Sequence, residues 1–278
     1  MLPWQPSQRA AHLEVDRPPY LFEDTLARRL LGSQADEPLS YHHTAGSHPV
    51  LMGTRVVVTP RARYVEDRLA EAVERGMRQY VILGAGLDTF AYRSPMAGQV
   101  AVYEVDQPET SAWKLELLEA ASIPVPAGVR LVPADLSDGP LVDRLVEAGF
   151  DSRQPAFVSW TGVTMYLDRA AVARTLGAIG GLAAGSETVF DHVLPREQRD
   201  AAGTEYASFA ESVGASNGEP WITSMAIDEV AAILAEAGLK TVAQPLLEDW
   251  VDPVLWQRTD SIRPYRLWAM AHSRVAGR

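Results

Sequence analysis

Cysteine is absent from this sequence of 278 residues, and lysine occurs only twice, at Lys114 and Lys240. The lack of cysteine excludes disulfides, thiolate metal sites and a cysteine nucleophile. Long apolar runs are missing as well: no stretch is long enough to cross a bilayer, and the first residues lack the apolar core of a secretion signal. These absences favour a soluble, cytoplasmic protein with no membrane partner.

Negative charge dominates the composition, with a formal net charge of −11 at pH 7. Such a balance repels phosphate backbones, and no run of Lys and Arg forms a compensating basic patch. We therefore expect a small molecule, and not a nucleic acid, as the partner. The content of hydrophobic residues, 47%, is enough for one large domain with a substantial core. No sequence feature indicates the oligomeric state.

The hydrophobic pattern changes near residue 63. Residues 1–63 are rich in Pro, Arg and His and show weak periodicity, apart from a short helix expected over 20–31, so we interpret them as an N-terminal cap or lid. Residues 64–278 have a regular pattern and are interpreted as the ligand-binding domain. Within them, residues 193–225 are expected to form an insertion beside an acceptor pocket.

Short apolar segments alternate with helical ones after residue 64, which predicts an α/β, Rossmann-like domain. The sheet should have seven mostly parallel strands with helices on both faces. The strands are predicted over 80–83, 100–105, 129–132, 156–160, 188–190, 240–243 and 266–271. The helices are predicted over 65–76, 109–121 and 141–148, from Asp168 onward, and over 227–237.

A glycine-rich segment, VILGAGLDT (81–89), follows the first of these strands. Ligands bind at this edge of a parallel sheet, and Gly84 and Gly86 allow the backbone to turn tightly and approach a ligand closely. Asp106 ends the next strand, twenty residues after Gly86, where a carboxylate can accept hydrogen bonds from two ribose hydroxyls. The sequence therefore predicts a nucleoside site.

Two residues indicate which nucleoside cofactor binds. Thr89 occupies the place of the third glycine of a dinucleotide motif, and Asp88 would repel a diphosphate. S-adenosylmethionine has no phosphate and carries a positive sulfur, so an acidic site suits it better than it suits NAD. Farther on, Asp135 can accept a hydrogen bond from the adenine amine while Leu136 packs on the ring. Asp135 is equally suited to cap the segment that begins at Ser137.

Five motifs occur in order along the chain: RARYVED (61–67), QYVILGAGLDTFAYR (79–93), VYEVDQP (102–108), ADL (134–136) and WTGVTMYL (160–167). Together they resemble the leucine carboxyl methyltransferase-like family of S-adenosylmethionine-dependent O-methyltransferases, in its bacterial natural-product branch. The motifs span about half of the chain. The resemblance implies a class I methyltransferase fold, an enzyme, and S-adenosyl-L-methionine as the cofactor.

The resemblance also implies roles for individual residues. Arg63 matches the arginine that binds the methionyl carboxylate, with Arg61 as the alternative; a guanidinium can pair with a carboxylate through two hydrogen bonds. Thr161 stands where the family usually has a Glu that helps to hold the methionyl ammonium. The remaining cofactor-binding residues implied are Gly84, Ala85, Gly86, Asp106, Gln107, Asp135 and Leu136.

The acceptor is expected to be a carboxyl or hydroxyl group of a small molecule, with a secondary metabolite favoured. A carboxylate needs no base, whereas a hydroxyl benefits from one, and His192 in FDHV is the candidate base. Tyr206 is the second candidate catalytic residue, as part of an acceptor wall. Thr161 keeps open a different reaction, such as a cyclisation with the cofactor as a structural element. His42, His43 and His48 are not expected to bind a metal, because adjacent side chains diverge.

Overall fold

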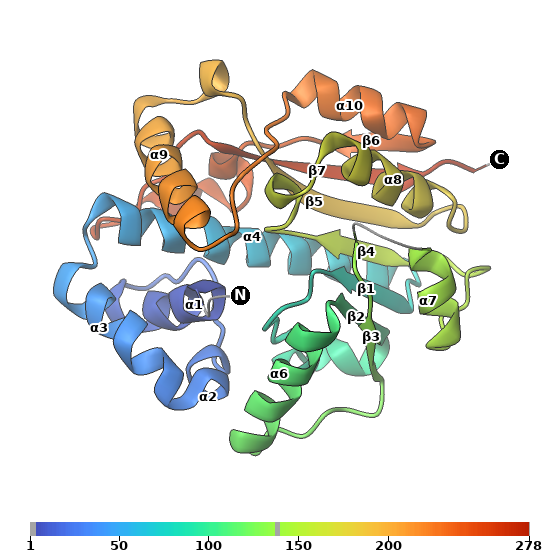
Figure 1. Cartoon of the computed structure of the whole chain (residues 1–278), viewed down its shortest axis with the longest axis horizontal. Helices are drawn as coiled ribbons and strands as arrows, with labels where there is room; N and C mark the ends of the chain where they lie inside the picture. The colour runs from blue at the N-terminus through green and yellow to red at the C-terminus, as the bar shows by residue number, and fades with distance from the viewer. Residues whose placement is uncertain (1–3, 137–139, 278) are drawn as a thin grey trace.

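The computed structural model describes residues 4–136 and 140–277, and its centre is one sheet of seven strands (Figure 1). The strand order is β3-β2-β1-β4-β5-β7-β6. Strands β1 to β5 are parallel to one another, whereas β7 is antiparallel to both of its neighbours, β5 and β6. The predicted α/β class and the seven strands are confirmed. Their bounds are β1 (Gln79–Leu83), β2 (Ala101–Asp106), β3 (Val129–Pro133), β4 (Phe157–Trp160), β5 (Glu187–Val193), β6 (Leu239–Ala243) and β7 (Trp268–Val275).

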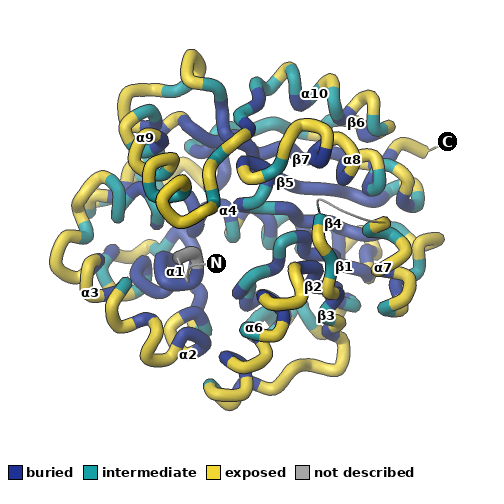
Figure 2. Tube along the Cα trace, viewed as in Figure 1, coloured by how far each residue is buried: buried dark blue, intermediate teal, exposed yellow. Residues whose placement is uncertain are grey.

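Helices cover both faces of the sheet, and Figure 2 shows the buried strands between more exposed helices. One face packs on α4, through apolar residues that include Val56 and Leu69. The other face packs on α7, α8 and α10. The α-helices are α1 (Trp4–Val15), α2 (Ala27–Leu31), α3 (Asp36–Ala45), α4 (Pro49–Glu74), α5 (Phe90–Arg93), α6 (Pro108–Ala120), α7 (Leu141–Glu147), α8 (Arg169–Gly180), α9 (Ala201–Ser216) and α10 (Ile227–Glu236). Among the described residues, no helix is both long and apolar enough to span a membrane.

The order of the strands reverses direction at β1. The chain passes from β1 outward to β2 and β3 on one side, and then crosses to β4 and β5 on the other. A crevice forms at the carboxyl ends of the strands on either side of such a point, because the connections leave in opposite directions. The loops after β1, β2 and β4 therefore meet at one place.

Helix α4 is longer than the sequence pattern predicted. A helix was expected from Val65, whereas α4 begins at Pro49, with the His48 side chain accepting a hydrogen bond from the Val50 N–H, and includes Pro60 in its interior. The division expected at residues 63/64 therefore falls inside a helix. The short helix expected over 20–31 is limited to α2, and a one-turn helix follows it at Gly32–Ala35.

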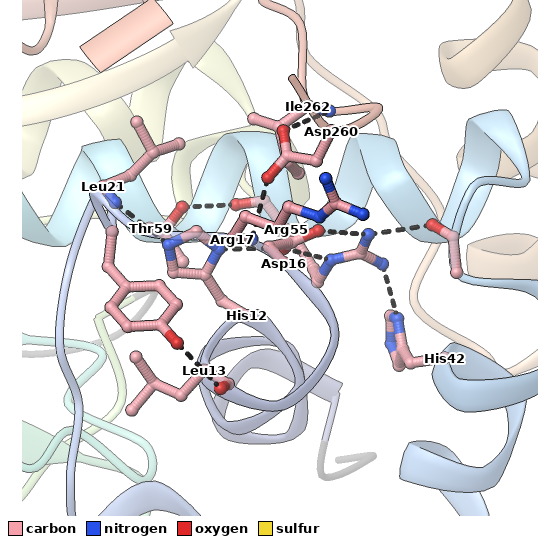
Figure 3. A network of polar contacts seen from close by, with 12 residues as sticks. His12, Leu13, Asp16, Arg17, Leu21, His42, Arg55, Thr59, Asp260 and Ile262 are labelled. Carbon is pink, nitrogen blue, oxygen red and sulfur yellow. Dashed lines mark hydrogen bonds and ion pairs between the residues drawn. The ribbon is translucent and has the colours of Figure 1, made fainter. Parts of the chain in front are cut away.

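A buried polar network attaches the N-terminal helices to α4 (Figure 3). Arg55, only 1% exposed, donates to both carboxylate oxygens of Asp16, at 2.7 and 2.9 Å, and to Nδ1 of His42, at 2.8 Å. Nε2 of His12 accepts a hydrogen bond from the Leu21 N–H, so its proton lies on Nδ1, which donates to Asp16 at 2.8 Å. The charged and polar side chains of this network thus have hydrogen-bond partners. The segment before α4 is packed as part of the domain.

Acid should weaken this structure through two buried histidines. Burial and the Arg55 charge lower the pKa of His42 to about 4, and burial lowers the pKa of His192 to about 4. Both side chains are neutral in the folded protein but bind protons in the unfolded chain at their ordinary pKa, near 6.5. The part of the folding stability that comes from keeping these two histidines neutral is therefore fully present above about pH 6.5, and it is lost as the pH falls toward 4.

We expect the thermal unfolding temperature to fall as the pH decreases from about 6.5 toward 4, because the two histidines outweigh the opposing carboxyl of Glu66, whose pKa burial raises to about 7. Replacing His42 by Gln should lower stability at pH 8 but make the decline with pH shallower. His43→Gln is the matched control, because His43 is about half exposed and pairs with Glu14 at the surface. Scanning fluorimetry across this pH range measures the effect, and parallel pH profiles for the wild type and His42→Gln would contradict it.

Candidate active site

A cavity of about 580 Å³ lies at the carboxyl edge of the sheet. A volume of this size is typical of sites for small molecules and cofactors. Its walls come from α1, α4, the loops after β1 to β4, and the segment between α9 and α10. Eight of the predicted cofactor-binding residues line it: Gly84, Ala85, Gly86, Asp106, Gln107, Asp135, Leu136 and Thr161.

The loop after β1 depends on glycine for its shape. Gly84 and Gly86 have φ values of +64° and +48°, a region that residues with a Cβ rarely adopt. A Cβ on Gly84 would also lie 2.4 Å from Cγ2 of Val163, which follows β4. The loop is tied to the next strand by a hydrogen bond from the Ala85 N–H to the Val105 carbonyl, at 3.0 Å. The backbone therefore forms the floor of the cavity.

Asp106 is held at the end of β2 by backbone donors. Its Oδ2 accepts from the Gly86 N–H at 2.6 Å and its Oδ1 from the Gln107 N–H at 2.7 Å. The carboxylate thus connects the ends of β1 and β2 where both line the cavity. Asp135 and Leu136 line the same cavity after β3, and the segment from Ser137 that Asp135 was alternatively expected to cap lies outside the described residues.

The two candidate arginines of α4 have different surroundings. Arg61 is 4% exposed, lines the cavity, and donates from Nη1 to Oδ2 of Asp191 at 2.8 Å. Arg63 does not line it: its side chain is 44% exposed and pairs with Asp67 at 3.0 Å. Two residues along a helix turn by about 200°, so 61 and 63 face opposite sides. Of the two candidates, Arg61 lines the cavity and Arg63 does not.

The two candidate catalytic residues also lie away from the cavity lining. His192 is fully buried in β5, and its Nδ1 contacts the Met225 carbonyl at 2.9 Å, on the face that packs on α8 and α10. Tyr206 packs on Tyr265, and burial raises its pKa. A general base must reach the proton that it removes, so this placement argues against a base role for His192.

An ionic cluster beside the β1 loop was not found by sequence reasoning. Arg9 of α1 donates to Asp24 at 2.7 Å and to the Leu87 carbonyl at 3.0 Å. Arg93 of α5 donates hydrogen bonds to both carboxylate oxygens of Glu66 of α4. Arg9, Glu66 and Leu87 line the cavity. Glu66 lies inside the motif RARYVED and could have been noticed from its helical spacing, whereas the N-terminal residues carry no comparable signal.

The N-terminal histidines His42, His43 and His48 each contact a different partner and do not form a cluster. His42 contacts Arg55, His43 contacts Glu14, and His48 caps α4. Over residues 4–136 and 140–277, no group of three or more His, Asp or Glu side chains is arranged to hold a metal ion.

The strand order, the antiparallel β7 and a cavity at the ends of β1, β2 and β4 define a class I methyltransferase fold. Residues 4–180 match the model of the leucine carboxyl methyltransferase family. Because the match covers more than half of the chain, the protein belongs to this family. The family and fold expected from the five motifs are thereby confirmed.

Relatives support this membership. YktD of Bacillus subtilis, named among the S-adenosyl-L-methionine-dependent methyltransferases, is 29% identical over 215 residues, which are 77% of this chain and 70% of YktD. Rv3787c of Mycobacterium tuberculosis, named in the same class, is 38% identical over 156 residues, which are 55% of this chain and 49% of that protein. The matched region is thus about half the length of the mycobacterial relatives. S-adenosyl-L-methionine is the cofactor after which these relatives are named.

Two solved structures show the same fold. A Thermobifida fusca protein described as a methyltransferase has a TM-score of 0.62 at 19% identity, covering 98% of this chain and 94% of its own. A DUF574 family protein from Streptomyces avermitilis has a TM-score of 0.58 at 18% identity, covering 96% of each chain. At these identities the likeness concerns the fold alone.

A methyl group at position 84 tests the glycine loop. Gly84→Ala forces a Cβ into the left-handed region and against Val163, so we expect a loss of roughly 2 kcal/mol in the free energy of unfolding. Gly98→Ala is the control, because a Cβ there meets no atom within 4 Å. Urea unfolding compares the two variants, and equal stability of both would show that the loop tolerates a side chain.

Proposed function

We propose that the protein transfers a methyl group from S-adenosyl-L-methionine to an oxygen, of a carboxyl or hydroxyl group, on a small molecule such as a secondary metabolite. The observation that carries the proposal is the single cavity shared by the β1 loop, Asp106, Asp135 and Arg61. A cofactor with a nucleoside end and an amino-acid end needs these chemically different walls side by side. The family membership supports the same conclusion.

The residues of the cavity fit this cofactor. The Asp106 carboxylate is fixed by two backbone N–H groups, and it would accept hydrogen bonds from the ribose hydroxyls. Asp135 and Leu136 would contact the adenine, and Gln107 and Thr161 border the same space. When bound, the cofactor supplies a methyl group activated by its positive sulfur. The part of the chain is to align the acceptor with that group and to exclude water.

Arg61 is suited to the methionyl carboxylate. One of its N–H groups pairs with Asp191, whose Oδ1 accepts from the Gly162 N–H at 2.7 Å. The other guanidinium donors of Arg61 make no hydrogen bond within the described residues, and the side chain lines the cavity. Asp191 thus fixes the guanidinium, and the free donors would pair with a carboxylate through charge-assisted hydrogen bonds.

The acceptor would enter along a mostly apolar wall. Val58, Tyr166, Pro220 and Ile222 line the cavity, and Tyr166 and Ile222 are 39% and 56% exposed. Apolar side chains at an opening suit an organic acceptor with a hydrophobic body. Among the described lining residues there is no histidine. A carboxyl acceptor needs no base, whereas a hydroxyl acceptor would have to use one of the carboxylates in the lining.

The two arginines make a matched pair of variants for cofactor binding. Arg61→Lys keeps the charge facing Asp191 but loses the planar set of donors, and we expect it to weaken binding of S-adenosyl-L-homocysteine by roughly tenfold. Arg63→Ala should leave the affinity unchanged, because Arg63 lies outside the cavity lining. Isothermal titration measures both, and the opposite ranking would return the role to Arg63.

Product analysis tests the reaction. The purified protein is incubated with S-adenosyl-L-methionine and a panel of phenols, alcohols and carboxylic acids, and mass spectrometry follows S-adenosyl-L-homocysteine and products. We expect S-adenosyl-L-homocysteine to form in step with a product heavier by one methylene group. A product of altered structure without that added mass, and without cofactor turnover, would instead favour the cyclisation-type reaction that Thr161 keeps open.

A further inference from the structure

The amino-acid end of the cofactor carries a negative carboxylate and a positive ammonium. Thr161 offers only a hydroxyl where the family usually has a Glu, and it lines the cavity. A cavity that removes the ammonium from water without an opposite charge would bind it poorly. Backbone carbonyls could hold the ammonium, but another carboxylate in the cavity would also supply the missing charge.

Helix α4 presents such a group. Five of its residues line the cavity, and at about 100° per residue they cover an arc of about 140° on the helix surface. Arg61 lies at one margin of this arc and Glu66 at the other. The residues between them on the arc are apolar: Val58, Ala62 and Val65. One helix wall thus has a positive group at one edge and a negative group at the other.

Charge around Glu66 is not balanced within the protein. Its carboxylate faces Arg93, which also lies 3.6 Å from Asp24, and Asp24 pairs with Arg9. The negative charge of Asp88, which also lines the cavity, is near enough to raise the pKa of Glu66. Three carboxylates therefore share two guanidiniums. One added positive charge, placed on the cavity side, would neutralise the group.

We infer that Glu66 binds the methionyl ammonium of the cofactor and supplies the negative charge that Thr161 lacks. Arg61 and Glu66 then hold the two charges of the amino-acid end from a single helix. Arg93 orients the Glu66 side chain through its two hydrogen bonds and is not itself required to contact the ammonium. This inference rests on the proposed function, because it concerns the same cofactor.

A proton competes with the ammonium for Glu66. Burial raises the pKa of Glu66 to about 7, although the Arg93 charge opposes the rise, and Asp88 and Asp24 add to it. Tyr80 faces the group from β1 and stays neutral, because burial holds its pKa well above the ordinary value. The ionised carboxylate is the form that binds the ammonium. Affinity should therefore increase as the pH rises from 6 to 8.

Two ligands separate an ammonium contact from a general effect on the cavity. S-adenosyl-L-homocysteine has the amino-acid end, whereas 5′-methylthioadenosine has the same nucleoside without it. In isothermal titrations at pH 8, we expect Glu66→Gln to weaken the binding of S-adenosyl-L-homocysteine by roughly tenfold or more, because one charge-assisted contact is lost. Its affinity for 5′-methylthioadenosine should not change.

Asp67→Asn is the matched control on the same helix, because Asp67 pairs with the exposed Arg63 outside the cavity lining. It should bind both ligands as the wild type does. Adding Thr161→Glu to Glu66→Gln should restore much of the lost affinity, since it returns a carboxylate to the position usual in the family. The increase of affinity between pH 6 and 8 should disappear in Glu66→Gln.

Three other outcomes would contradict the inference. Equal losses for both ligands would show that Glu66 only shapes the loop, and an unchanged affinity for S-adenosyl-L-homocysteine would overturn the inference outright. In both cases the wild type still binds the cofactor product, and the proposed function stands. A wild-type protein that bound neither ligand would overturn the proposed function and this inference together.

Discussion

The buried ion pair between Arg61 and Asp191 is the contact on which the site depends. It joins α4 to β5, and the second oxygen of Asp191 binds the Gly162 N–H in the loop after β4. Removing one partner of such a pair costs about 3–5 kcal/mol, because the other is left buried without its counter-charge. Through this pair a helix from the N-terminal third of the chain is held over the carboxyl edge of the sheet. The pair therefore keeps α4 in place as one wall of the cavity.

The N-terminal segment is part of the site and not a detached cover. Arg9 reaches from α1 to the Leu87 carbonyl in the β1 loop, and Asp24 accepts from the Thr89 hydroxyl at 2.7 Å. The Arg55 network fixes the same segment to α4. Apolar side chains of α1 to α3 pack on Leu87 and on α6. Cofactor affinity and the order of the N-terminal helices should thus be linked, since both use the β1 loop.

Sequence patterns located the sheet and the glycine loop at its edge well, because each depends on local chemistry. A strand that is buried on both faces is usually rich in apolar residues, as β1 is from Tyr80 to Leu83, and glycine is the residue that suits the backbone of the loop at Gly84. The same reasoning misplaced groups whose position depends on element length. The strand before His192 was expected to end at 190, but β5 continues to Val193.

Within a strand, neighbouring side chains point to opposite faces, so Asp191 meets Arg61 while His192 enters the core behind the sheet. In the same way, the register of α4 decides between Arg61 and Arg63, and a helix expected only from residue 65 could not reveal it. The ionic cluster of Arg9, Asp24, Glu66 and Arg93 joins residues far apart in sequence. No local pattern predicts such a meeting.

We propose that one cavity accepts an adenosyl amino acid, with its nucleoside at Asp106 and its charged end on α4. A crystal structure with S-adenosyl-L-homocysteine tests this most directly. We expect ribose hydroxyls within hydrogen-bond distance of Asp106 and the amino-acid end between Arg61 and Glu66. Electron density for the ligand elsewhere on the protein, or with its amino-acid end directed away from α4, would contradict it.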